Sequence, residues 1–179
     1  MPPPQATSRE THPPEDFGIE RMQYLAWENV QCEFAFDGSW RDIYVLNVGL
    51  AAWNRMLNGL KAAKYDLIYY QDGQPEELPA RPEDAFSLTG EINRLLRVHF
   101  CGVVANCHFF TPDEIEFDID PREVLGQKQL DALFGFMQCL AQSVGQDAVL
   151  CPENMPEIVI FRIRAGAASV EYCSGNNGA

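Results

Sequence analysis

The stretch that decides the fold is EIEFDIDPREVLGQKQLDALFGFMQCLAQSVG, residues 114–145. Its first seven residues alternate acidic and apolar side chains, which predicts a strand with Ile115, Phe117 and Ile119 on its buried face. Beyond this strand the apolar residues recur every three or four positions, which predicts a long helix ending at Gly145. A half-apolar strand followed by an amphipathic helix predicts a core between a sheet layer and a helix layer.

Working outward from this stretch, strand and helix patterns alternate along the rest of the chain. Aromatic alternation and Asp37-Gly38 predict a hairpin over residues 30–47, and Asp72-Gly73 predicts a turn into a weak edge strand. Helices are predicted within 48–64 and 82–97, one long strand over 98–110, and final strands at 147–151 and 157–166. The resulting order, ββα-ββα-ββα-ββ, predicts an α+β fold: a largely antiparallel sheet with about three helices packed on one face.

The chain length of 179 residues suits one domain. Residues 1–16 are rich in proline and polar side chains, so we expect a flexible tail there. We expect a single α+β domain over 17–173 and a second flexible tail over 174–179.

Charge and cysteine usage narrow the classes of partner. The chain has 26 acidic and 13 basic residues, a net charge of −13, which disfavours nucleic acid because phosphates are bound mainly by Lys and Arg. No apolar segment is long enough to span a bilayer, so no membrane partner is expected. The six cysteines have no zinc or redox spacing, and the N-terminus has no signal-peptide pattern, so we expect a cytoplasmic protein without a cofactor.

The acidic face of the predicted strand allows three interpretations. Glu114, Glu116, Asp118 and Asp120 fall on one side of it, as on any wet sheet face. Asp118-x-Asp120 also has the oxygen ligands that divalent cations prefer, but no phosphate-cradling glycine loop accompanies the pair. The third interpretation is a docking surface for a basic protein. In "DPRE", residues 120–123, Asp120 is also predicted to cap a helix or turn.

Other candidate constellations carry less chemistry. His99 and His108 are nine residues apart in the predicted long strand, so we expect them on opposite faces and not as joint ligands or a catalytic pair. Two prolines bracket the segment that contains Glu153 and Met155, which predicts a rigid exposed loop able to contact a partner. We expect no catalytic residue and assign no metal ligand.

These observations favour a non-catalytic cytoplasmic protein that binds a basic protein partner through an acidic surface, as immunity and inhibitor proteins do. The predicted partner-binding residues are Glu114, Glu116, Asp118, Glu153 and Met155. Two alternatives stay open: a divalent-metal-dependent enzyme that uses the acidic strand 114–120, and a self-associating structural protein that forms a homodimer.

Overall fold

The structure is a computed structural model that describes residues 25–86 and 92–173. Its nine strands are β1 (Arg41–Leu46), β2 (Asp66–Gln71), β3 (Gln74–Glu76), β4 (Arg94–Phe100), β5 (Val103–Cys107), β6 (Glu114–Ile119), β7 (Ala148–Pro152), β8 (Phe161–Ile163) and β9 (Val170–Tyr172). They form one antiparallel sheet in the order β3-β2-β4-β5-β6-β1-β7-β8-β9. The predicted α+β class with an antiparallel sheet is confirmed. The two predicted tails, 1–16 and 174–179, lie outside the described residues.

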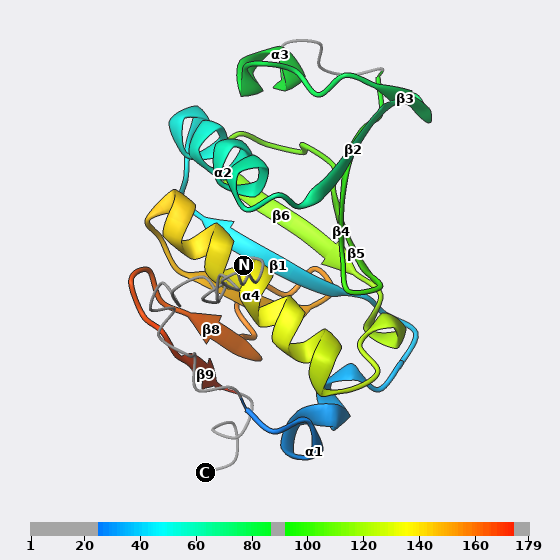
Figure 1. The fold of residues 1–179 in the computed structure, drawn as a ribbon, viewed down its shortest axis with the longest axis vertical. Coiled ribbons are helices and arrows are strands. Elements are labelled where there is room, and N and C mark those ends of the chain that lie inside the picture. The colour runs from blue at the N-terminus through cyan, green and yellow to red at the C-terminus, as the bar shows by residue number, and fades with distance from the viewer. Residues whose placement is uncertain (1–24, 87–91, 174–179) are drawn as a thin grey trace, which may run out of the picture.

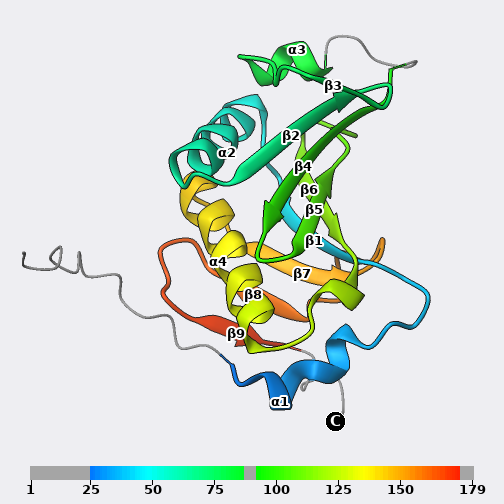
Figure 2. The same ribbon diagram turned by 45° about the vertical axis from the view of Figure 1, so that its right-hand side comes forward.

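Two long helices cover one face of this sheet (Figures 1 and 2). The helices are α1 (Trp27–Val30), α2 (Leu50–Ala62), α3 (Pro82–Phe86) and α4 (Gln127–Val144), with 3₁₀ turns η1 (Gln31–Phe34) and η2 (Pro121–Glu123). Helix α4 packs on β1, β7 and β8, and α2 packs on α4. The two helices approach so closely at Gly59 that a methyl group there would collide with the Ser143 side chain. None of the helices in the described ranges is long and apolar enough to cross a membrane.

The deciding stretch folds as its pattern predicts. Ile115, Phe117 and Ile119 of β6 are fully buried, and the Phe117 ring packs edge-on against Phe136 of α4 at a centroid distance of 5.2 Å. Helix α4 ends at Gly145, whose φ of 76° is the left-handed conformation that glycine adopts most easily. The core therefore lies between β6 with its neighbours and the apolar face of α4.

The predicted hairpin over 30–47 is wrong in its first arm. Residues Gln31–Phe34 form the η1 turn, and only the second arm is a strand, β1. Strand β1 pairs with β6 on one edge and β7 on the other, so no edge is left for a local hairpin partner. Phe34 is buried and stacks on Phe161, whereas Phe36 is 47% exposed, so the aromatic alternation does not mark one face of a strand.

The predicted long strand over 98–110 is also wrong. It is divided into β4 and β5 by a tight turn at Cys101-Gly102, where both residues have positive φ. Strand β4 begins at Arg94, inside the segment predicted to be helical to residue 97. The turn changes the register: Arg97 pairs with Asn106, which places His99 and His108 on the same face of the sheet rather than on opposite faces.

The observed element order departs from the predicted ββα repeats. One strand precedes α2, three strands lie between α3 and α4, and β9 at the far edge was not predicted. Strand β9 is the short segment VEY, which has too few residues to show alternation. The Asp72-Gly73 turn and the edge position of the proline-containing β3 are as predicted.

Candidate functional site

We call the face of the sheet opposite α2 and α4 the open face. It carries a continuous row of polar side chains. In this row Arg97 of β4 pairs with Asn106 of β5, Asn106 pairs with Asp118 of β6, and Asp118 pairs with Asp42 of β1. Glu116 and Tyr44 pair in the next row on β6 and β1. Like charges directly opposite on neighbouring strands are destabilising, so the Asp118–Asp42 pair needs compensating contacts.

A pocket of about 460 Å³ lies over these rows and is called the open-face pocket. Its carboxylates are Asp42, Glu116, Asp118 and Glu153, its other polar side chains are Arg97, Asn106, His108 and Asn154, and its apolar lining is Trp40, Leu95 and Phe110. The four carboxylates come from β1, β6 and the loop after β7. Since these elements are far apart in sequence, only the sheet topology brings the carboxylates together.

Tyr44 links two of the carboxylates. Its hydroxyl donates to Asp42 Oδ2 at 2.9 Å and lies 3.3 Å from Glu116 Oε1. The Asn154 backbone N–H also donates to Asp42 Oδ2, at 2.7 Å. Burial raises the pKa of Asp42, and burial together with the negative charge of Asp42 raises the pKa of Glu116 to about 6. The negative charges of Asp42 and Glu116 therefore lower the stability of the folded state.

Asp118 is held by two donors from β5 and the loop that follows it. The Asn106 side-chain amide donates to Asp118 Oδ1 at 2.9 Å, and His108 Nε2 lies 3.4 Å from Asp118 Oδ2. This contact raises the pKa of His108 because the carboxylate stabilises the protonated imidazole. These contacts offset the repulsion between Asp118 and Asp42.

Aromatic side chains border the pocket. Phe110 is 71% exposed and stacks on His108 at a centroid distance of 5.3 Å. The preceding residue, Phe109, has a φ of 54°, and its buried ring stacks on Trp53 of α2 at 5.2 Å. The left-handed backbone at Phe109 thus separates a ring that anchors the segment in the core from a ring exposed at the pocket.

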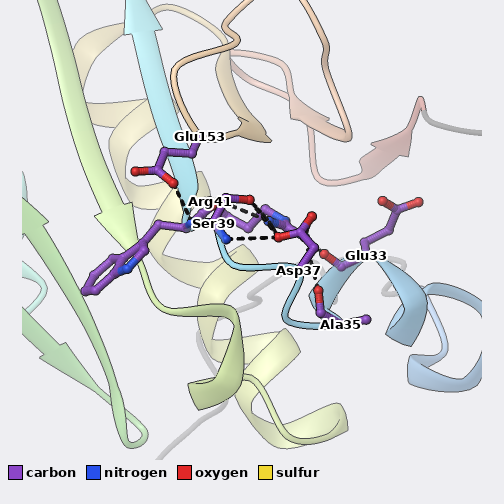
Figure 3. A network of polar contacts seen from close by, with 7 residues as sticks. Glu33, Ala35, Asp37, Ser39, Arg41 and Glu153 are labelled. Carbon is purple, nitrogen blue, oxygen red and sulfur yellow. Dashed lines mark hydrogen bonds and ion pairs between the residues drawn. The ribbon is translucent and has the colours of Figure 1, made fainter.

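Trp40 also lines the pocket, and the buried Arg41 next to it in sequence holds its loop. Figure 3 shows the polar contacts of Arg41. The Arg41 guanidinium, 6% exposed, donates to the carbonyl oxygens of Glu33 at 3.0 Å, Ala35 at 3.3 Å and Trp40 at 3.0 Å. It also contacts the Asp37 carboxylate at 3.4 Å. The Trp40 backbone N–H donates to Glu153 Oε2 at 2.9 Å. Arg41 therefore fixes the loop before β1, and Glu153 joins it to the loop after β7.

The structure brings together three of the five predicted partner-binding residues. Glu116, Asp118 and Glu153 all line the open-face pocket. Glu114 lies at its margin, in a small cleft shared with Glu116 and Phe110, and Met155 is 45% exposed in the β7–β8 loop without lining the pocket.

Sequence reasoning missed the remaining polar members of the site, which are Asp42, Arg97, Asn106, His108 and Asn154. Asp42 alternates with buried Ile43 in "RDIYV", residues 41–45, and that alternation was a usable signal for a second acidic strand face. The places of Asn106 and His108 depend on the Cys101-Gly102 turn, which the apolar pattern concealed.

Asp120 is separate from this pocket. As predicted, it caps a helical turn: its Oδ1 accepts the Arg122 backbone N–H at 2.9 Å, and its Oδ2 pairs with Arg122 Nη2 at 2.7 Å. Within residues 25–86 and 92–173, no group of three or more His, Cys, Asp or Glu side chains is arranged to hold a metal ion.

Glu116→Gln is expected to raise the free energy of unfolding by about 1 kcal/mol near pH 7.5 and to change it little near pH 4.5. The folded-state pKa of about 6 exceeds the ordinary 4.5, so the group's stabilising protonation is complete below 4.5 and is lost as pH rises through 6. The full shift is worth about 2 kcal/mol, which we halve because the side chain is partly solvated.

Urea denaturation of wild type and Glu116→Gln at the two pH values measures this effect, with the exposed Glu77→Gln as the matched control. A difference between wild type and Glu116→Gln that is equal at both pH values would contradict the raised pKa.

Comparison with known proteins returned no relative. No family model, no curated protein and no solved structure matches the chain.

Proposed function

We propose that this protein binds a basic protein partner through its open face, as a non-catalytic protein of the inhibitor or immunity type. The observation that carries the proposal is the convergence of Asp42, Glu116, Asp118 and Glu153 on one surface pocket. Arg97 and His108 are the basic side chains that line the same pocket, so its carboxylates outnumber its cations. The field of a chain with net charge −13 would also steer a basic partner toward it.

Exposed apolar side chains at the pocket and on the loop that carries Glu153 support a protein partner. Phe110 is 71% exposed at the pocket, and Met155 and Ile158 are 45% and 41% exposed on the loop that also carries Glu153. Protein interfaces combine such apolar anchors with polar groups that provide specificity. The pocket and the loop that contributes Glu153 to it therefore offer both kinds of contact.

The test compares partner capture by two variants of equal charge. Glu116→Gln with Asp118→Asn removes two negative charges from the pocket, and Glu28→Gln with Glu77→Gln removes two from exposed positions elsewhere. Immobilised wild type and control are expected to retain the same basic protein from a host lysate at low salt, with the pocket variant binding it at least about tenfold more weakly. High salt should weaken the wild-type complex.

Three outcomes count against the proposal. Equal retention by the pocket variant and the control would show that the open face is not the docking surface. A rise in melting temperature with millimolar Mg²⁺ or Mn²⁺, lost in Asp118→Asn, would favour the metal-dependent alternative. A dimer in light scattering that the pocket variant dissociates would show that the open face serves self-association instead.

A further inference from the structure

We infer that the open-face pocket is a receptor for one guanidinium group, supplied by an arginine side chain of the partner. This inference rests on the proposed function and names the chemical group that enters the pocket. It stands on the unused hydrogen-bond acceptors of the pocket, on its aromatic borders and on the position of its own arginine.

Three carboxylates of the pocket each keep one oxygen without a hydrogen bond. Every hydrogen bond to Asp42 goes to Oδ2, the one to Glu116 goes to Oε1, and the one to Glu153 goes to Oε2. Within the described part of the chain, Asp42 Oδ1, Glu116 Oε2 and Glu153 Oε1 accept none. Asp42 is only 2% exposed as a residue and lines the pocket, so a donor that enters the pocket can pair with its unused oxygen, Oδ1.

The arrangement suits guanidinium better than ammonium. A guanidinium presents five N–H donors in a rigid plane and loses less hydration than a lysine ammonium when it is buried. It also packs favourably against aromatic rings, and Trp40 and Phe110 line the pocket. Acceptors on three separate elements match a donor that spreads its hydrogens around a plane.

The pocket's own arginine leaves these oxygens free. The Arg97 guanidinium lies over the Tyr70 ring of the neighbouring strand β2, 5.2 Å from the ring centroid. In the described part of the chain, no ion pair within 4.0 Å joins Arg97 to Asp42, Glu116 or Glu153. The excess negative charge of the pocket is therefore available to an external cation.

The test uses Nα-acetyl-arginine amide as the probe and Nα-acetyl-citrulline amide as its uncharged counterpart of similar shape. In ¹⁵N–¹H spectra of the full chain, the arginine probe is expected to shift the backbone amides of Trp40 and Asn154 in a saturable manner, at millimolar concentrations. The citrulline probe should shift them at least about tenfold more weakly. Asp42→Asn is expected to weaken arginine binding at least tenfold, and Asp66→Asn, an exposed aspartate on β2, should not.

Glu153→Gln provides a second variant if Asp42→Asn does not fold, because Glu153 lies on a loop and glutamine keeps an acceptor for the Trp40 N–H. Equal shifts with both probes, or unchanged arginine affinity in Asp42→Asn and Glu153→Gln, would overturn the inference. That result would leave the proposed function intact if the pocket variant still lost its protein partner. Conversely, arginine binding by a protein whose partner is insensitive to the pocket would refute only the docking proposal.

Discussion

Trp53→Ala is expected to lower the free energy of unfolding by about 3–5 kcal/mol, the largest effect of any substitution considered for this protein. Trp53 is 1% exposed, and its ring contacts Phe86 edge-on at 5.0 Å and stacks on Phe109 at 5.2 Å. Its indole N–H donates to the Pro112 carbonyl at 3.1 Å. Alanine would leave a cavity between α2 and the segment after β5, and would leave that carbonyl without its donor.

Chemical denaturation of Trp53→Ala and Trp53→Phe separates the two contributions. Phenylalanine keeps most of the ring packing and loses the hydrogen bond to Pro112, so its cost should be about 1–2 kcal/mol. In ¹⁵N–¹H spectra, the backbone amide resonance of Phe110 in Trp53→Phe should stay near its wild-type position. If Trp53→Ala lowered the free energy of unfolding by less than about 1 kcal/mol, the segment 109–112 would not depend on α2 for its stability.

The parts of the fold that could be predicted from sequence are those in which local pattern and tertiary environment agree. Strand β6 and helix α4 each have one apolar face, and both faces enter the same core. The turn at Asp72-Gly73 was predictable because its residue types tolerate positive φ. Cys101-Gly102 makes an equally tight turn, but it lies inside an apolar run where no polar residue marks it. The hairpin expected before β1 was wrong because β6 and β7, distant in sequence, occupy both edges of β1.

The candidate site was only partly predictable because it depends on which strands are neighbours. The acidic alternation in β6 identified Glu116 and Asp118 as surface residues. It could not show that Asp42 of β1 lies directly opposite Asp118, since that pairing joins residues more than seventy positions apart in sequence. Glu153 was predicted from its proline-flanked loop, and its contact with the Trp40 N–H is a consequence of the β1–β7 pairing. A local pattern predicts exposure, whereas the pocket arises from strand order.

Carboxylates that lie directly opposite each other on neighbouring strands are unfavourable on a sheet surface whose only role is stability. Asp42 lies opposite Asp118, and Glu116 has a pKa of about 6. Apolar or oppositely charged pairs on the same strands would stabilise the sheet more. Residues that cost stability are expected where function needs them, which is consistent with the proposed binding role of the open face.

Arg41→Leu is expected to lower the free energy of unfolding by about 2–4 kcal/mol. The salt bridge to Asp37 contributes little of this, because the Asp37 side chain is 61% exposed and water can replace the arginine. The cost arises mainly from the backbone carbonyls of Glu33, Ala35 and Trp40, which would lose their donor (Figure 3). Leucine fills part of the buried volume but offers no hydrogen bond.

The matched control is Arg81→Leu, because Arg81 is 73% exposed and its salt bridge to Asp84 lies on the surface. Urea denaturation should show a loss below about 0.5 kcal/mol for this control. If the two variants lost equal stability, Arg41 would not be the anchor of the loop before β1.

Because that loop carries Trp40, Arg41→Leu is also expected to weaken binding of the arginine probe without removing any pocket carboxylate. Arg81→Leu should leave that affinity unchanged, which separates the positioning of Trp40 from a general loss of positive charge.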